Sequence, residues 1–237
     1  MLKSETMTGL ISAVPFEADL IVKSLKPTAS PVLEGTIAGS RVAYICSGVG
    51  IANAARAVAI LAERERPDAI ILFGIGGAYA RSGPQKGGLA AASAEVYAEG
   101  GLLIPAAKEK TVDGFRALGF PLLKKGGKNF FGSFPLDRGL LRQAKKCIAD
   151  LRTGRFLTVW TAQRSVRKAD LLGIKYGAVM ENMEGAAAAQ TALFYGIPLL
   201  EIRGVSNIAG EPPRKWIKEE AAVNCQAAVL KFLETWF

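Results

Sequence analysis

The feature that most constrains the fold is a repeated alternation of short apolar runs with longer helical patterns. The runs are nearly continuous in apolar residues, which is typical of strands covered on both faces. They lie at 9–14, 41–46, 69–74, 88–93, 155–159, 177–182 and 198–204, and the helical patterns at 51–65, 137–151, 185–196 and 218–236. This alternation predicts an α/β fold, a three-layer sandwich around a largely parallel central sheet.

The segment 34–45 departs from this alternation because it is typical of a hairpin. In "EGTIAGSRVAYI", two strand-like stretches flank Gly39 and Ser40, a pair suited to a tight turn. We therefore expect some antiparallel pairing and a mixed sheet. The segments 84–88 and 121–129 are interpreted as loops, and no repeat or linker divides the 237 residues, so we expect a single domain over 1–237.

The composition excludes several kinds of chemistry. The chain contains no histidine, which removes the commonest general base and every Ser–His or Cys–His pair. Its three cysteines, Cys46, Cys147 and Cys225, are far apart and odd in number, so we expect neither a disulfide framework nor a paired-cysteine zinc site. Acid–base chemistry must fall to carboxylates or another group, no metal or cofactor is expected, and a reducing cytoplasm is the expected compartment.

The formal charge of +9 raises nucleic-acid binding as a hypothesis. However, the basic clusters at 124–128, 142–146 and 164–168 are short and scattered, without interleaved aromatic residues. We interpret them as solvated surface; a negatively charged small substrate would also suit this charge. No eighteen apolar residues run together, and Pro15 and Glu17 interrupt the first apolar patch, so we expect no export signal or membrane span.

Polar residues follow two of the predicted strands. Glu17 comes three residues after the first apolar run, and Ser206 and Asn207 come just after the last. A helix N-terminus favours a carboxylate, and Ser and Asn are good caps, so each has an ordinary structural explanation. The other interpretation is functional, because ligands of open α/β sheets bind where strands end.

Two glycine-rich segments, "CSGVGIANAA" (46–55) and "FGIGGAYA" (73–80), are each expected to lead from a strand into a helix. Glycines there, such as Gly48, Gly76 and Gly77, allow backbone N–H groups to approach an anion, a sugar or a base. Ordinary turn geometry is the favoured explanation for either segment taken alone, since neither has the spacing of a Walker loop or a good dinucleotide fingerprint. A third segment, "MENMEGAAAA" (180–189), places two carboxylates and an amide before four alanines.

In combination these motifs resemble a known family. "SAVPFEAD", "SGVGIANAA", "GIGGA", "MENMEG" and "RGVSN" follow the order and approximate spacing of the nucleoside phosphorylase/nucleosidase superfamily, over residues 9–233. The chain is most similar to its hydrolytic branch, which contains methylthioadenosine/S-adenosylhomocysteine nucleosidases and, more closely, the futalosine hydrolases. "MENMEG" followed by "RGVSN" is the most specific part.

The resemblance implies roles for particular residues. Glu184 would bind the sugar hydroxyls with Met183 packed against the sugar, Glu17 would activate water, and Asn207 would hold the leaving purine. A carboxylate can accept from two vicinal hydroxyls, and a carboxylate can act as the general base in a chain without histidine. The further candidates for substrate binding are Gly48, Gly76, Gly77, Asn182 and Ser206, with Trp160 as the purine's neighbour, although 159–166 departs from the family's pattern.

Two departures bear on specificity. Asn207 stands where adenine-releasing relatives have an aspartic acid that protonates N7; an amide can accept from N7–H and donate to O6, which favours a 6-oxopurine such as hypoxanthine. Leu72 and Phe73 stand where phosphorolytic relatives have an arginine, which favours hydrolysis. Gly204 replaces a more usual alanine.

The leading hypothesis is therefore hydrolysis of futalosine to hypoxanthine and dehypoxanthine futalosine, a step of menaquinone biosynthesis. Two alternatives remain open: another purine nucleosidase or phosphorylase, acting on methylthioadenosine, S-adenosylhomocysteine or inosine, and a non-catalytic protein that binds purines or nucleic acid. The resemblance further implies a homodimer or larger homo-oligomer whose partner is a small purine nucleoside, with no nucleic acid or membrane involved.

Overall fold

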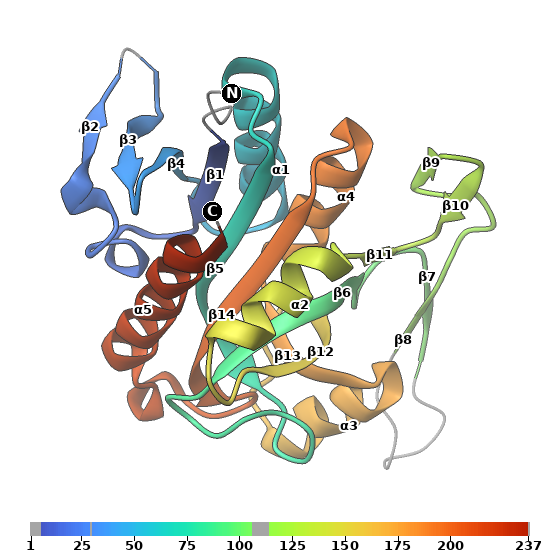
Figure 1. The fold of residues 1–237 in the computed structure, drawn as a ribbon. Coiled ribbons are helices and arrows are strands. Elements are labelled where there is room, and N and C mark those ends of the chain that lie inside the picture. Colours follow the sequence, from blue (N-terminus) through green and yellow to red (C-terminus); the bar gives the residue numbers. More distant parts are fainter. Residues whose placement is uncertain (1–5, 29, 106–113, 237) are drawn as a thin grey trace.

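Ten strands form one mixed sheet with helices packed on both of its faces (Figure 1). The computed structural model describes residues 6–28, 30–105 and 114–236. The strands of this sheet are β1 Met7–Ser12, β2 Leu25–Pro27, β3 Leu33–Ile37, β4 Ser40–Cys46, β5 Ala69–Ala78, β6 Leu89–Tyr97, β11 Ser133–Pro135, β12 Arg152–Thr158, β13 Ala178–Asn182 and β14 Leu199–Ile208. Two small hairpins pair β7 Leu102–Ile104 with β8 Gly114–Arg116, and β9 Leu123–Lys125 with β10 Lys128–Phe130. The helices are α1 Ile51–Ile60, α2 Arg138–Cys147, α3 Val166–Tyr176, α4 Gly185–Tyr195 and α5 Lys218–Trp236, with short 3-10 turns η1 Pro15–Glu17, η2 Val22–Ser24 and η4 Pro213–Lys215 and a π-helical turn η3 Leu61–Glu65 after α1.

The strand order combines parallel and antiparallel pairs. β1 pairs in parallel with β4 and β5, and β5 also pairs in parallel with β14. β13 pairs antiparallel with β5, and β14 antiparallel with β6. Because β6 and β13 both pair with β12, the strands β5, β14, β6, β12 and β13 close into a ring. The expected mixed sheet is confirmed.

The two faces of the sheet carry separate hydrophobic cores, which makes the three layers. In β5, Ile70 and Leu72 point into the core beneath α1 and α4, whereas Ile71 and Phe73 point into the core beneath α2 and α5. Alternate side chains of a strand face opposite sides, so a strand covered on both faces needs an unbroken apolar run. The predicted three-layer α/β architecture is confirmed (Figure 1).

The interpretation of 73–80 as a strand-to-helix turn is wrong. Gly74, Gly76 and Gly77 lie inside β5, which continues to Ala78 and is followed by no helix before β6. A Cβ on Gly76 would come within 2.8 Å of the backbone oxygen of Glu181, and one on Gly74 within 2.5 Å of the Glu17 carboxylate. These glycines therefore permit close approach of other segments to the strand.

Three further local expectations need correction. Ser206 and Asn207 lie within β14 rather than after it. The β3–β4 hairpin turns at Ala38 and Gly39, both with positive φ, rather than at Gly39 and Ser40. The segment 121–129, expected to be a loop, contains the hairpin of β9 and β10 around two glycines with positive φ.

Helix α3 was not anticipated, although the sequence carries signals for both of its ends. The side chain of Ser165 accepts from the Lys168 backbone N–H at 3.4 Å, and Gly177 ends the helix with φ of 63°. By contrast, α1, α4 and α5 begin where the periodicity placed them. α2 ends earlier than expected because Ile148 is extended and Asp150 has positive φ.

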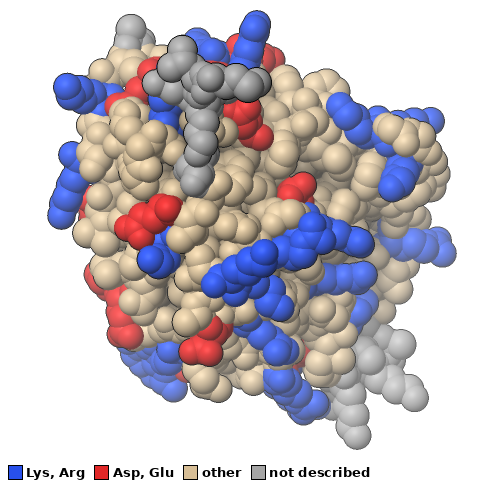
Figure 2. All heavy atoms as spheres, in the orientation of Figure 1, with Lys and Arg blue, Asp and Glu red and all other residues tan. Residues whose placement is uncertain are grey.

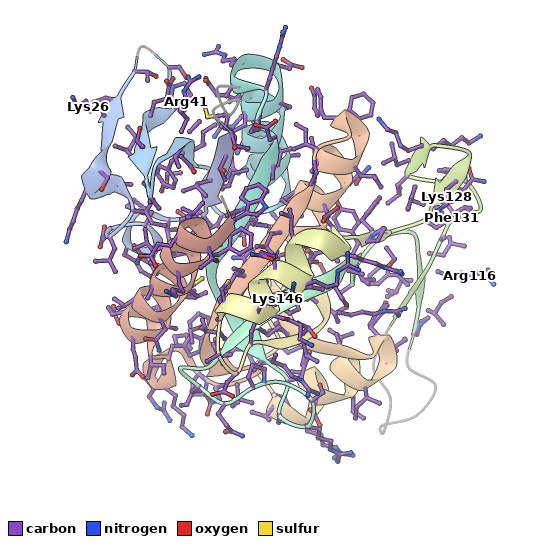
Figure 3. The ribbon with its side chains drawn as sticks, in the orientation of Figure 1. Lys26, Arg41, Arg116, Lys128, Phe131 and Lys146 are labelled. Atoms are coloured by element: carbon purple, nitrogen blue, oxygen red, sulfur yellow. The ribbon has the colours of Figure 1, made fainter. Side chains whose placement is uncertain are left out.

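Basic side chains are distributed over many elements. Figure 3 shows Lys26 and Arg41 on the β2–β4 side, Arg116 and Lys128 on the outer hairpins, and Lys146 on α2. In Figure 2 blue spheres gather over α2, and uncharged and acidic surface surrounds them. Within the described ranges, no helix combines the length and the apolar character that crossing a bilayer requires. The same residues contain no group of three Cys, Asp or Glu side chains arranged to hold a metal ion.

Gly204→Ala should destabilise the fold, because a Cβ at Gly204 would come within 2.0 Å of the Ala221 backbone oxygen in α5. Overpacking of this kind costs about 1–3 kcal/mol in the free energy of unfolding. Denaturant unfolding measures it, with Gly139→Ala in α2 as the control, since there a Cβ approaches only a side-chain oxygen at 3.0 Å. Equal stability of wild type and Gly204→Ala would show that α5 moves away at no cost.

Candidate active site

A cavity of about 200 Å³ lies where the carboxyl ends of β1, β13 and β14 meet the middle of β5. Ligands of α/β sheets collect at such strand ends. The residues that line it are Ala13, Val14, Glu17, Val49, Ile75, Gly76, Gly77, Val159, Ala162, Gln163, Glu181, Asn182, Met183, Glu184, Arg203, Ser206, Asn207, Gly210, Glu211 and Trp216. The cavity thus brings together residues that are up to about two hundred positions apart in the chain.

Glu17 is the carboxylate at the β1 side of the cavity. It ends the 3-10 turn that Pro15 begins, and its side chain is buried. Its Oε2 accepts from the backbone N–H groups of Ala13 at 2.9 Å and Val14 at 3.1 Å, and its Oε1 accepts from Ile75 at 2.8 Å. Burial raises the pKa of Glu17 above its ordinary value, and the positive charge of Arg203 opposes that rise.

Glu184 lies at the start of α4, directly after β13. Its Oε1 accepts from the backbone N–H of Gly50 at 3.0 Å, which ties it to the beginning of α1. Its Oε2 accepts from the backbone N–H of Met183 at 3.3 Å and lies 3.3 Å from Nη2 of Arg203. Met183 is half-buried and lines the same wall. The carboxylate is therefore held by α1, β14 and its own chain neighbour at the wall of the cavity.

Arg203 is a fully buried cation in β14 that lines the cavity beside both carboxylates. Its Nε donates to Oε1 of Glu201 at 2.9 Å, and its Nη1 donates to the Ile75 carbonyl at 3.3 Å. Burial alone would lower the pKa of Arg203, but the carboxylates of Glu201, Glu184 and Glu17 raise it above its ordinary value. Arg203 is therefore charged, and its charge partly balances the acidic groups of the site.

Ser206 and Asn207 both line the cavity although they are consecutive residues of a strand. Neighbouring residues of a regular strand face opposite sides, but the β14–β5 register shifts between Val205 and Asn207. The Ser206 hydroxyl donates to Oδ1 of Asn207 at 2.8 Å, and Nδ2 of Asn207 donates to the Ile208 carbonyl at 3.0 Å. The bulge therefore orients the amide toward the cavity and fixes it there.

Glu181 is the third buried carboxyl of the cavity wall, and it lies near Asn207. A Cβ on Gly77 would lie 3.2 Å from Nδ2 of Asn207 and 3.4 Å from Cγ of Glu181, so both side chains border the same glycine. Oε2 of Glu181 accepts from the Tyr79 hydroxyl at 3.0 Å. Burial raises the pKa of Glu181 to about 7. This end of the cavity thus offers an amide and a carboxyl that can change its charge near neutral pH.

The remaining predicted site residues lie at or beside the cavity. Gly76 and Gly77 line it, and Asn182 lines it while its Oδ1 accepts from the backbone N–H groups of Glu184 and Gly185. Gly48 and Trp160 are not among the lining residues. Gly48 turns the chain between β4 and α1 with φ of 86°, and the Trp160 ring, 61% exposed, lies over Gly50.

Sequence reasoning assigned no role to Arg203 or Glu181, which the structure places in the cavity wall. The signal for both was present: "LLEIRG" carries two charges in an otherwise apolar run, and Glu181 ends another such run. Charged residues in a strand covered on both faces are rarely buried unless they are paired. Charges within such apolar runs therefore indicate a buried, paired group, and this signal points to Arg203 and Glu181.

Comparison with known proteins agrees with this architecture. The model of the phosphorylase superfamily matches residues 8–234. The chain belongs to the phosphorylase superfamily. The resemblance inferred from the sequence motifs is thereby confirmed.

Individual members of the superfamily are similar over nearly their whole length. A futalosine hydrolase of Thermus thermophilus is 34% identical, over 88% of this chain and 93% of its own. A futalosine hydrolase of Streptomyces coelicolor is 32% identical, over 95% of both chains. The structure of a methylthioadenosine/S-adenosylhomocysteine nucleosidase from Colwellia psychrerythraea in complex with adenine superposes with a TM-score of 0.81 at 26% identity, covering 98% of this chain and 96% of that one.

Proposed function

We propose that the protein hydrolyses the N-glycosidic bond of futalosine and releases hypoxanthine and dehypoxanthine futalosine. The observation that carries this proposal is the similarity to two futalosine hydrolases at more than 30% identity over most of each chain. The geometry of the cavity supports it, because Glu17, Glu184 and Asn207, which come from separate motifs, line the same cavity. The proposal assigns the protein to the N-glycosyl hydrolases.

Glu17 is the proposed general base. Its three backbone hydrogen bonds hold the carboxylate in one orientation, and its raised pKa makes it a stronger base than an exposed glutamate. A water molecule beside it would lose a proton to Glu17 as its oxygen attacks C1′ of the sugar. The bond from C1′ to N9 of the base breaks in the same process, and the electron pair of that bond leaves with the purine. The purine takes up a proton from solvent at N7 and leaves as neutral hypoxanthine, and Glu17 returns its proton to solvent.

Glu184 is the proposed sugar-binding residue. Its carboxylate can accept from two vicinal hydroxyls at once, and it is already fixed by Gly50 and Arg203 before substrate binds. Because this carboxylate is already ordered, substrate binding does not have to immobilise it, and more of the binding free energy is left to orient the sugar. The negative charges of Glu184 and Glu17 would also stabilise the positive charge that develops on the sugar as the glycosidic bond breaks.

Asn207 is the proposed base-reading residue. An amide can accept from N7–H and donate to O6 of a 6-oxopurine, whereas the 6-amino group of adenine offers that donor no acceptor. The bond from the Ser206 hydroxyl supports a fixed amide orientation. A mismatched buried hydrogen-bonding group is costly, so hypoxanthine is favoured over adenine as the leaving group.

Water rather than phosphate is the proposed nucleophile. Among the lining residues of the described part of the chain, Arg203 is the single cation, and Glu201 and Glu184 already pair with it. A phosphate dianion placed beside Glu17 and Glu184 would meet two carboxylates and no unpaired cation. Repulsion between like charges therefore disfavours phosphorolysis.

We further propose that the protein forms a homo-oligomer and works in the cytoplasm. A groove between α1, α4 and the β9–β10 hairpin is lined by exposed apolar side chains including Ile51, Phe120, Leu122 and Phe194. Val49, two residues before Ile51 in the chain, is also exposed, and it lines the active-site cavity. A second copy of the chain would remove this apolar surface from water. The three cysteines are free, as a reducing compartment would keep them.

Incubation with futalosine, inosine and methylthioadenosine, with and without phosphate, tests the reaction. Chromatography should detect free hypoxanthine from futalosine at a rate that phosphate does not change.

Glu17→Gln should retain ligand binding but lose about 10²–10⁴-fold in kcat, because the amide cannot accept a proton. Glu219→Gln, an exposed change on α5, serves as the control. Near-normal turnover by Glu17→Gln, or product only in the presence of phosphate, would contradict the mechanism.

Asn207→Asp should weaken the use of hypoxanthine nucleosides and increase the relative use of adenine nucleosides. The carboxyl loses the N–H that meets O6 and, when protonated, can donate to N7. One mismatched buried contact costs about 1–3 kcal/mol, or roughly tenfold to more than a hundredfold in the ratio of kcat/KM values. Asn129→Asp, on the exposed β10, is the matched control. An unchanged ratio would mean that Asn207 does not read the base.

Phe194→Lys should disrupt the oligomer, because it places a charge in the proposed apolar contact, where Phe194 is 58% exposed. Light scattering should give a multiple of 25.1 kDa for wild type and a lower mass for the variant. Ile174→Lys, an exposed apolar position on α3, should leave the mass unchanged. A wild-type mass equal to one chain would rule the oligomer out.

A further inference from the structure

Two carboxyl groups that do not line the cavity meet beneath its sugar-binding end. They belong to Glu95 of β6 and Glu201 of β14, and both residues are 0% exposed. A Cβ on Gly185 would overlap Oε1 of Glu95 and Oε2 of Glu201, so both oxygens border the same small space at the start of α4. The absence of a side chain at Gly185 is what allows the two carboxyls to come so close.

A pair of carboxyls this close and this buried holds one proton between them, because two negative charges there would be too costly. Oε2 of Glu201 has no hydrogen-bond partner among the described residues unless Glu95 donates to it. Glu201 is the member favoured in the charged form, since its Oε1 accepts from Nε of Arg203. Burial, followed by the charge of Glu201, raises the pKa of Glu95 well above its ordinary value.

Glu95 is bonded to the side chains that hold the first turn of α4. Its Oε1 accepts from Nδ2 of Asn182 at 2.5 Å, and its Oε2 accepts from the Thr158 hydroxyl at 2.8 Å. With their donor groups directed to Glu95, Asn182 and Thr158 present oxygens to the helix. Oδ1 of Asn182 accepts from the backbone N–H of Glu184 at 2.9 Å, and the Thr158 oxygen accepts from that of Ala186 at 2.6 Å.

Glu201 acts on the opposite side of the pair, through Arg203. The guanidinium lies between Glu201, at 2.9 Å from Nε, and Glu184, at 3.3 Å from Nη2. The charge of Arg203 also lowers the pKa of Glu17 against the effect of burial. The negative charge of Glu201 beside Arg203 therefore weakens the effect of Arg203 on the pKa of Glu17, the proposed general base.

We propose that Glu95 and Glu201 are positioning residues that share one proton. Through Asn182 and Thr158, the pair orients Glu184, and through Arg203 it sets the proton affinity of Glu17. The role in turnover rests on the proposed function, whereas the shared proton is a property of the folded protein alone.

Other ionisable groups near Glu17 and Glu95 do not interfere with a measurement of the pKa of Glu17. Glu17 is faced by Arg203, Glu184, Tyr44 and Cys225, and Glu95 lies near Tyr79 and Tyr97. Burial raises the pKa of all three tyrosines, and it raises that of Cys225 to about 12, so these groups stay neutral across the range of an activity assay. Glu181, with a pKa of about 7, titrates in wild type and in each variant alike.

The decisive comparison is between Glu201→Gln and Glu95→Gln. In Glu201→Gln, the charge beside Arg203 is lost or moves to Glu95, so Arg203 lowers the pKa of Glu17 further. The acid limb of the kcat/KM profile should then shift to lower pH by roughly half a unit or more. Glu95→Gln imitates the neutral carboxyl and should leave that limb in place. kcat should fall because the amide offers a single accepting oxygen to the two donors Asn182 and Thr158. Glu234→Gln, an exposed change in α5, should alter neither quantity.

Infrared difference spectroscopy tests the shared proton without any activity. Above the pKa of Glu181, about 7, wild type minus Glu95→Gln should show the carbonyl band of a protonated carboxyl. If Glu201→Gln does not fold, the presence of this band in wild type at that pH still tests whether Glu95 and Glu201 share a proton. Absence of the band, or equal acid-limb shifts in both variants, would overturn the proposal. If wild type cleaves no nucleoside, the proposed function fails, and the infrared result still decides the proton.

Discussion

The buried guanidinium of Arg203 is the constraint on which the site depends. A cation without exposure to water is tolerated only when carboxylates pair with it, and buried carboxylates likewise require a cation. Glu201 comes from the same strand two residues earlier, and Glu184 comes from the start of α4. Glu17, after β1, feels the same charge across the cavity. One cation thus couples the ends of three strands electrostatically, and this is the arrangement that places two carboxylates beside a proposed sugar.

Close approach of polar groups in this core requires positions without side chains. Gly74 leaves room for the Glu17 carboxylate, Gly76 for the backbone of β13, and Gly185 for the carboxyls of Glu95 and Glu201. A methyl group at any of these positions would separate groups that are now in contact. Separation of buried charges loses more electrostatic interaction energy than it would in water, because the local dielectric is low. These glycines therefore allow close contact between segments, and Gly74 and Gly185 do so at carboxyl groups, rather than shaping turns.

The sequence was sufficient for the regular elements and insufficient for the irregular ones. Apolar runs and helical periodicity located β1, β4, β5, β6, β12, β13 and β14 and the helices α1, α2, α4 and α5, because burial on two faces imposes those patterns. Gly74 to Gly77 were misread, since a glycine that permits a turn and one that permits close packing have the same sequence signature. The shift in register at Ser206, which turns two consecutive side chains to the same cavity, depends on pairing with β5 and leaves no local mark.

The sequence by itself determined the α/β class, the absence of histidine as a candidate acid–base group, and, through its motifs, membership of the phosphorylase superfamily. It also named eight residues that line the cavity, because the motifs that contain them come together around it. Only the tertiary structure decided that Arg203 and Glu181 line that cavity and that Glu95 and Glu201 meet beneath it. Ion pairing and carboxyl contact join residues from different strands, and the distance between strands is set by packing of the whole sheet, which no local pattern encodes.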